Sequence, residues 1–123
     1  MNSPRPVFLN LLEIRQPVTA VVSILHRLAG LILAVTTPLW IFLLARSLDG
    51  QAGYAAVVVS FDNAAMSLLL VAVLWAMAHH ICAGLRLLIL DICGHPVRGR
   101  LSAWLVLLLS AVSLVLAVLA VVL

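Results

Sequence analysis

The sequence NAAMSLLLVAVLWAMAHHICAGL occupies residues 63–85 and contains no Asp, Glu, Lys or Arg. A membrane-spanning helix needs roughly 17–25 predominantly apolar residues, so this run is long enough to cross a bilayer. Residues 28–45 and 101–123 form two further uncharged runs, and charged residues separate the three. The sequence therefore predicts an all-α protein of one domain with three transmembrane helices, at about 18–47, 63–91 and 101–123.

The composition of the whole chain also indicates a bilayer environment. Of its 123 residues, 66% are hydrophobic and 9% are charged, whereas soluble domains are about 45–50% apolar and about 25% charged. A soluble chain of this length would have too little interior to hide so much apolar surface from water. We therefore expect an integral membrane protein whose main surroundings are lipid.

The basic residues predict the orientation of the chain. All seven are arginines, and the cytoplasmic flanks of membrane helices carry the excess of basic residues. Most of them fall at one end of the predicted bundle, namely Arg5, Arg15, Arg27, Arg98 and Arg100. The opposite loop, residues 47–62, has only Arg46 beside it. We therefore expect a cytoplasmic N-terminus and no nucleic-acid partner, because the arginines mark helix ends and do not form a stripe.

Several cofactor motifs are absent from the sequence. There is no GxGxxG or P-loop, and Cys82 and Cys93 form neither a CxxC motif nor a set of four metal ligands. We thus expect no flavin, no nucleotide and no iron–sulfur cluster within this chain, and no catalytic residue. The helix at 101–123 contains nothing ionisable, so we expect it to pack or to face lipid.

Polar residues in the first predicted helix are the first functional signal. Ser23, His26, Arg27 and Gly30 follow the spacing i, i+3, i+4, i+7, which places them on one helical face. They could form a pocket wall for a quinone carbonyl or a porphyrin propionate. Alternatively, Arg27 only extends to the headgroups and Ser23 bonds back to its own helix.

The second predicted helix carries the second polar set: His79, His80, Gly84, Arg86 and Asp91. His80, Gly84 and Asp91 recur on one face, while His79 and Arg86 lie together about a third of a turn away. Imidazole is a common axial ligand of haem iron, and a glycine one turn along would let a flat macrocycle approach. A histidine bonded to a neighbouring helix is the alternative. Adjacent residues differ by about 100°, so only one histidine can face a given partner.

Two segments, read with their flanks, resemble the cytochrome b556 (C) subunit family of succinate dehydrogenase, respiratory complex II. The segment RPVFLNLLEIRQPVTAVVSILHRLAG, residues 5–30, is similar to the family's N-terminal signature, which ends in S-x-x-H-R-x-x-G. The segment HICAGLRLLILD, residues 80–91, is similar to H-x-x-x-G-x-R-H-x-x-x-D. One position departs from the pattern: Leu87 stands where the family usually has histidine.

The resemblance implies roles for individual residues. His80 would be the axial ligand of haem b, and a partner membrane subunit would supply the second ligand. Ser23 and Arg27 would border a ubiquinone or menaquinone site. The haem propionates or pocket would involve His26, Arg27, Gly84 and Arg86. His79, as a lesser candidate ligand, and Asp91, near a docking iron–sulfur subunit, complete the expected set.

The resemblance also implies a setting. The chain would be a multi-pass anchor in the inner (plasma) membrane of a bacterium, without catalytic activity alone, in a complex with a second membrane subunit, an iron–sulfur subunit and a flavoprotein. It would form part of a haem-binding helical bundle. Two alternatives stay open: a haem-free quinone-binding anchor of the same complex, and a small membrane transporter subunit. A transporter usually needs an acidic residue deep in the membrane, and none lies within residues 63–90.

Overall fold

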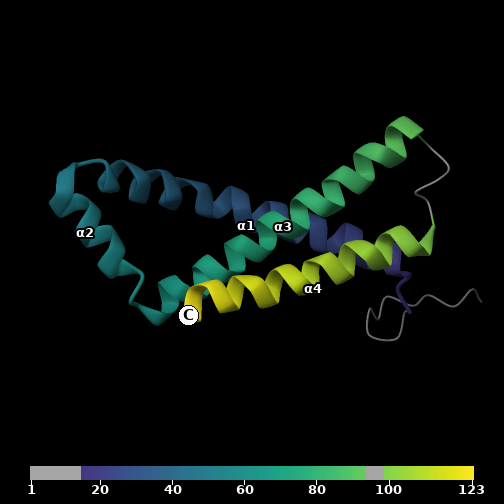
Figure 1. The fold of residues 1–123 in the computed structure, drawn as a ribbon. Helices are drawn as coiled ribbons and strands as arrows, with labels where there is room; N and C mark the ends of the chain where they lie inside the picture. The colour runs from purple at the N-terminus through teal and green to yellow at the C-terminus, as the bar shows by residue number, and fades with distance from the viewer. Residues whose placement is uncertain (1–14, 94–98) are drawn as a thin grey trace, which may run out of the picture.

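Four α-helices account for most of the described residues, and three of them are long (Figure 1). The structure, a computed structural model, describes residues 15–93 and 99–123. In chain order the helices are α1 (Val18–Ser47), α2 (Gly50–Ser60), α3 (Ala64–Cys93) and α4 (Arg100–Val122). By length and composition, α1, α3 and α4 can each cross a membrane. Their ends lie within two residues of the positions predicted from the sequence.

The segment at residues 47–62, predicted to be a loop, instead contains α2. Gly50 has a φ of 75°, in the region that favours glycine, and turns the chain after α1. Gly53 lets α2 approach closely, because a Cβ atom at this position would overlap the carbonyl oxygen of Arg46. The loop prediction was wrong because the valine-rich run of α2 shows no helical periodicity and its glycines resemble turn signals.

The starts of α1 and α3 differ in their capping. Asn63 accepts a hydrogen bond from the backbone N–H of Ala65 at 2.8 Å with its side-chain oxygen and so caps the start of α3. Pro17 lies just before α1, where its carbonyl accepts the N–H of Ala20 at 2.8 Å. Residues 1–14, with the Arg-Pro start of the first motif, lie outside the described residues, as do Gly94, His95, Pro96 and Arg98.

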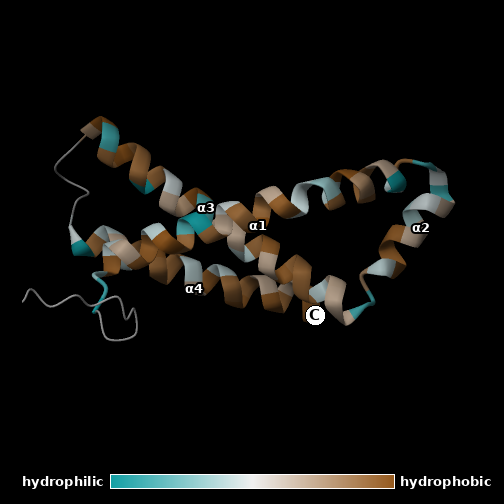
Figure 2. Cartoon of the chain, turned by 180° about the vertical axis from the view of Figure 1, so that it is seen from behind, coloured by the Kyte–Doolittle hydropathy of each residue, from teal (hydrophilic) through white to brown (hydrophobic). Residues whose placement is uncertain are grey.

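Small residues allow α3 to pack closely against both α1 and α4. Among residues 15–93 and 99–123, the buried apolar side chains are alanines and valines: Val22, Ala29, Val73, Ala76, Ala83, Ala103, Val106 and Ala117. Small side chains let membrane helices approach each other, and dispersion contacts then hold them together. Large apolar side chains point outward, and Figure 2 shows a largely hydrophobic helix surface with a hydrophilic segment where α3 crosses α1.

The topology gathers the polar halves of α1 and α3 in one part of the molecule. Figure 1 shows the start of α1, the end of α3 and the start of α4 at one end, and α2 at the other. Because α1 and α3 are antiparallel, the first turns of α1 and the last turns of α3 become neighbours. The two polar sets found in the sequence are therefore brought together.

Candidate functional site

His26 of α1 and His80 of α3 stack against each other at the crossing of the two helices. Their ring centroids lie 4.1 Å apart with an interplanar angle of 15°. His80 Nδ1 lies 3.2 Å from the backbone carbonyl oxygen of His26. A carbonyl oxygen can only accept, so Nδ1 must carry the donated proton, and in the neutral ring Nε2 then keeps its lone pair. Metal-binding histidines are commonly oriented in this way, by donating the other ring N–H to a carbonyl.

Each imidazole lies against a glycine of the opposite helix. A Cβ atom at Gly30 would lie 2.9 Å from Cε1 of His80 and 3.3 Å from its Nδ1. A Cβ atom at Gly84 would lie 3.5 Å from Nε2 of His26. We expected the space beside Gly84 to let a flat macrocycle approach, but in the structure the His26 imidazole occupies it. The two H-x-x-x-G segments, 26–30 and 80–84, therefore pack against each other in antiparallel directions, with the histidine of each segment against the glycine of the other.

The two glycines predict opposite outcomes for the same small substitution. Gly30→Ala forces a methyl group into the His80 ring, so we expect a loss of about 1–3 kcal/mol of stability. Gly84→Ala adds only an ordinary van der Waals contact with His26, and we expect a change below about 1 kcal/mol. The denaturation midpoint of the purified protein in mild detergent measures both. Equal losses in the two variants would contradict the close fit at Gly30.

His26 has an unusual ring nitrogen. Its Nε2 is buried and has no hydrogen-bond partner within residues 15–93 and 99–123. Buried polar atoms in folded proteins are nearly always paired, so an unpaired one calls for an explanation such as a bound molecule. The atom lies beside His80 and Gly84, at the crossing of α1 and α3.

Ser23 and Arg27 lie beside this histidine pair, and both are available to a ligand. Ser23 is half-buried, and its hydroxyl makes no hydrogen bond in the described part of the chain. Thr36 and Thr37, by contrast, donate to carbonyls of their own helix at 2.8 Å and 2.7 Å. Arg27 is exposed and has no ion pair among the described residues. The alternative in which Ser23 bonds back to α1 is therefore not observed.

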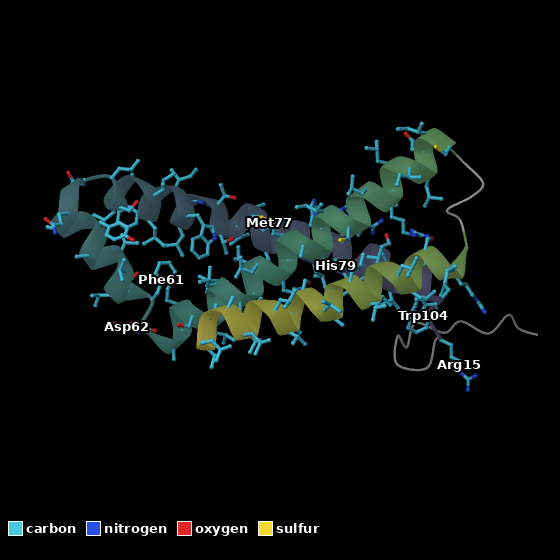
Figure 3. The ribbon with its side chains drawn as sticks, viewed as in Figure 1. Arg15, Phe61, Asp62, Met77, His79 and Trp104 are labelled. Carbon is cyan, nitrogen blue, oxygen red and sulfur yellow. The ribbon has the colours of Figure 1, made fainter. Side chains whose placement is uncertain are left out.

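His79 and Arg86 share a face of α3, as the spacing predicts, but that face packs on α4. His79 is fully buried, and its Nδ1 lies 2.9 Å from the Ser110 hydroxyl oxygen. Arg86 is 8% exposed and donates from Nε to the Ser102 hydroxyl at 3.0 Å. Figure 3 shows His79 directed between α3 and α4. This placement argues against His79 as a ligand for an external group.

Sequence reasoning missed the two α4 residues that pair with these side chains. Ser102 and Ser110 were not singled out, because serines in an apolar helix often bond only to their own backbone. Ser113 does so, donating to the carbonyl of Ser110 at 2.8 Å. The expectation that α4 packs is confirmed, but its packing includes polar contacts with α3.

The remaining predicted residues lie toward the end of α3. Leu87 and Asp91 are exposed, and Asp91 makes no ion pair in the described ranges. Cys82 is half-buried beside the apolar core, whereas Cys93 is the exposed last residue of α3 and not a loop residue. The structure therefore brings Ser23, His26, Gly30, His80 and Gly84 together and leaves Asp91 at the surface.

The fold and the site together define a multi-pass helical membrane protein whose buried polar groups gather where α1, α3 and α4 meet. The chain belongs to the succinate dehydrogenase/fumarate reductase transmembrane subunit family, whose sequence profile matches residues 1–119. It is similar to the succinate dehydrogenase cytochrome b556 subunit of Coxiella burnetii (strain RSA 493 / Nine Mile phase I). The two are 33% identical over 120 residues, which cover 95% of this chain and 96% of the relative. The resemblance found in the two motifs is thereby confirmed, and the chain is a membrane-anchor subunit of this class of complex.

Proposed function

We propose that this chain binds haem b together with a second membrane subunit and forms part of the site that reduces quinone. The observation that carries the proposal is the bond between His80 Nδ1 and the His26 carbonyl, 3.2 Å long. It fixes the ring and leaves Nε2 as the available ligand atom. His79, the neighbouring candidate, directs its Nδ1 to Ser110. His80 is therefore the axial ligand that we assign.

The donor set around His80 fits a haem. His26 offers a buried ring nitrogen and Arg27 a guanidinium, both without a partner among the described residues, and these are two kinds of group that can bind propionate carboxylates. Gly84 leaves room for the macrocycle beside the helix once the His26 ring has moved out of that space. Arg86, predicted for the same pocket, instead faces α4 and donates to Ser102, so it is not part of this donor set. When bound, the haem supplies a one-electron carrier whose potential depends on axial ligation and burial.

Ser23 and Arg27 are the quinone-binding residues in this proposal. The hydroxyl of Ser23, which makes no hydrogen bond in the described part of the chain, can donate one to a quinone carbonyl oxygen. Arg27 provides a fixed positive charge beside it. Preorganised donors and charges of this kind stabilise the negative charge that develops on an oxygen during reduction.

The rest of the complex completes the proposed reaction. A flavoprotein subunit oxidises succinate, and an iron–sulfur subunit passes the electrons to the membrane site. The N-terminus is cytoplasmic in this arrangement. Support comes from the end of the molecule where α1 and α4 start and α3 ends (Figure 1), because the chain places Arg15, Arg27 and Arg100 there. Exposed Asp91 at the same end suits contact with the iron–sulfur subunit.

A haem-free anchor is the second candidate function, and one observation favours it. The His26 ring occupies the space at Gly84, and Leu87 replaces the usual histidine of the family motif. A dithionite-reduced minus oxidised spectrum of the purified complex separates the two candidates. Haem binding predicts a b-type band in an amount equal to the flavin content. A spectrum without that band, from a complex that still reduces quinone, would establish the haem-free anchor.

A further inference from the structure

A buried hydrogen-bond network joins α3 to α4 directly beside His80. Its members, called the His79 network here, are Trp75, His79 and Ser110. The indole Nε1 of Trp75 donates to the Ser110 hydroxyl oxygen at 2.9 Å, and this oxygen lies 2.9 Å from His79 Nδ1. The Trp75 and His79 rings also stack, with centroids 5.6 Å apart and an angle of 24°. His79 is 0% exposed and Ser110 is 5% exposed.

The Ser110 hydroxyl links the two rings of α3. An indole N–H can only donate, so the Ser110 oxygen accepts from Trp75 and has its own proton available for Nδ1 of His79. The other nitrogen of His79, Nε2, is buried and has no hydrogen-bond partner within the described residues. The polar contact that holds the His79 ring is therefore the one to Ser110 of α4.

This network determines how α3 is rotated about its own axis. Successive helical residues differ by about 100°, so an α3 rotation that fixes His79 toward Ser110 also fixes the direction of His80. If α3 were rotated about its axis by about 100°, His79 would face α1 in place of His80. The same rotation would leave Trp75, His79 and Ser110 without hydrogen-bond partners in an apolar interior, which is strongly disfavoured. Without the network, two adjacent histidines would compete for the same position.

We propose that the His79 network positions the haem ligand: it holds α3 in the rotation that directs His80, and not His79, toward α1. The inference rests on the proposed ligation of haem by His80. His79 is thus a positioning residue that does not touch the haem iron. Ser110 is the residue of α4 that selects between the two histidines.

The test compares variants in the whole purified complex. Ser110→Ala removes the hydroxyl, Trp75→Phe removes only the indole N–H, and His79→Leu removes the imidazole at similar volume. His79→Asn restores an acceptor near the position of Nδ1 and serves as the rescue variant. Ser113→Ala is the matched control, because Ser113 lies on the same helix and bonds only to the carbonyl of Ser110.

The readouts are the midpoint potential of the haem and the low-field electron paramagnetic resonance signal of the ferric form, which depends on the orientation of the axial imidazoles. We expect Ser110→Ala and His79→Leu to shift both, Trp75→Phe to shift them less, and His79→Asn to restore the wild-type values. Ser113→Ala should leave them unchanged.

Two other results would overturn the proposal. If the network variants keep the wild-type potential and signal, the network does not position His80. If Ser113→Ala shifts them equally, the effect is general to α4. If His79→Leu fails to assemble, Ser110→Ala and Trp75→Phe decide by the same criteria. A wild-type complex without a His80-dependent haem band is a separate outcome, since it refutes the proposed haem ligation itself.

Discussion

We expect His80→Ala to remove the b-type absorption band from the purified complex. The reason is that the substitution deletes the imidazole whose Nε2 is the proposed iron ligand and whose Nδ1 is held by the His26 carbonyl. In the proposed site only the partner subunit would then supply an axial ligand, so we expect haem per flavin to fall at least tenfold, in line with the loss of one main ligand. A pyridine haemochrome assay against flavin content measures this ratio.

Two controls make the result specific to ligation. Succinate oxidation with a soluble artificial acceptor should stay at the wild-type rate, which shows that the flavoprotein and iron–sulfur subunits are still assembled. Added imidazole should partly restore the band in His80→Ala, because it can occupy the space left by the ring. A band of wild-type intensity in His80→Ala would rule out His80 as the ligand.

We expect Arg27→Leu to produce the second large effect, on quinone reduction. Arg27 is exposed beside Ser23 and has no ion pair in the described part of the chain, so its charge is available to a bound quinone. Removing one preorganised group that stabilises developing negative charge costs about 10²–10³ in rate, and we expect a loss of about 10²-fold. Ser23→Ala removes a single hydrogen bond, and we expect a loss of about tenfold. The measurement is succinate-dependent reduction of a soluble quinone.

Arg46→Leu is the matched control for this pair. Arg46 lies in the last turn of the same helix, where its side chain is about half exposed and pairs with Asp49 at 3.6 Å. Because it is far along α1 from Ser23, its loss should leave quinone reduction unchanged. The assignment fails if Arg27→Leu and Ser23→Ala reduce quinone at the wild-type rate. It also fails if both lower succinate oxidation by the artificial acceptor to the same extent.

The sequence predicts the long helices well because lipid imposes a simple requirement. A spanning helix must be apolar over about 20 residues, and the three spans predicted on that basis agree with α1, α3 and α4 to within two residues. The short helix α2 lies outside this requirement. Its valines and glycines carry no periodicity, so packing against the end of α1 through Gly53 is needed to recognise it.

The residues of the site could be predicted from the sequence, but the contacts between them could not. Helical spacing places His80 and Gly84 on one face, as it places His26 and Gly30. It does not reveal that His80 packs on Gly30 and His26 on Gly84, because that exchange depends on the level at which α1 and α3 cross. Likewise, the shared face of His79 and Arg86 follows from their spacing, but its packing on Ser110 and Ser102 does not.

A density map of the intact complex, determined by electron cryo-microscopy in mild detergent or a lipid disc, examines the site without substitution. We predict continuous density between His80 Nε2 and a haem iron, with Nδ1 of the same ring on the His26 carbonyl and His79 still bonded to Ser110. Iron bound to any other residue of this chain would contradict the assignment. So would a map without haem in which the His26 ring still fills the space at Gly84.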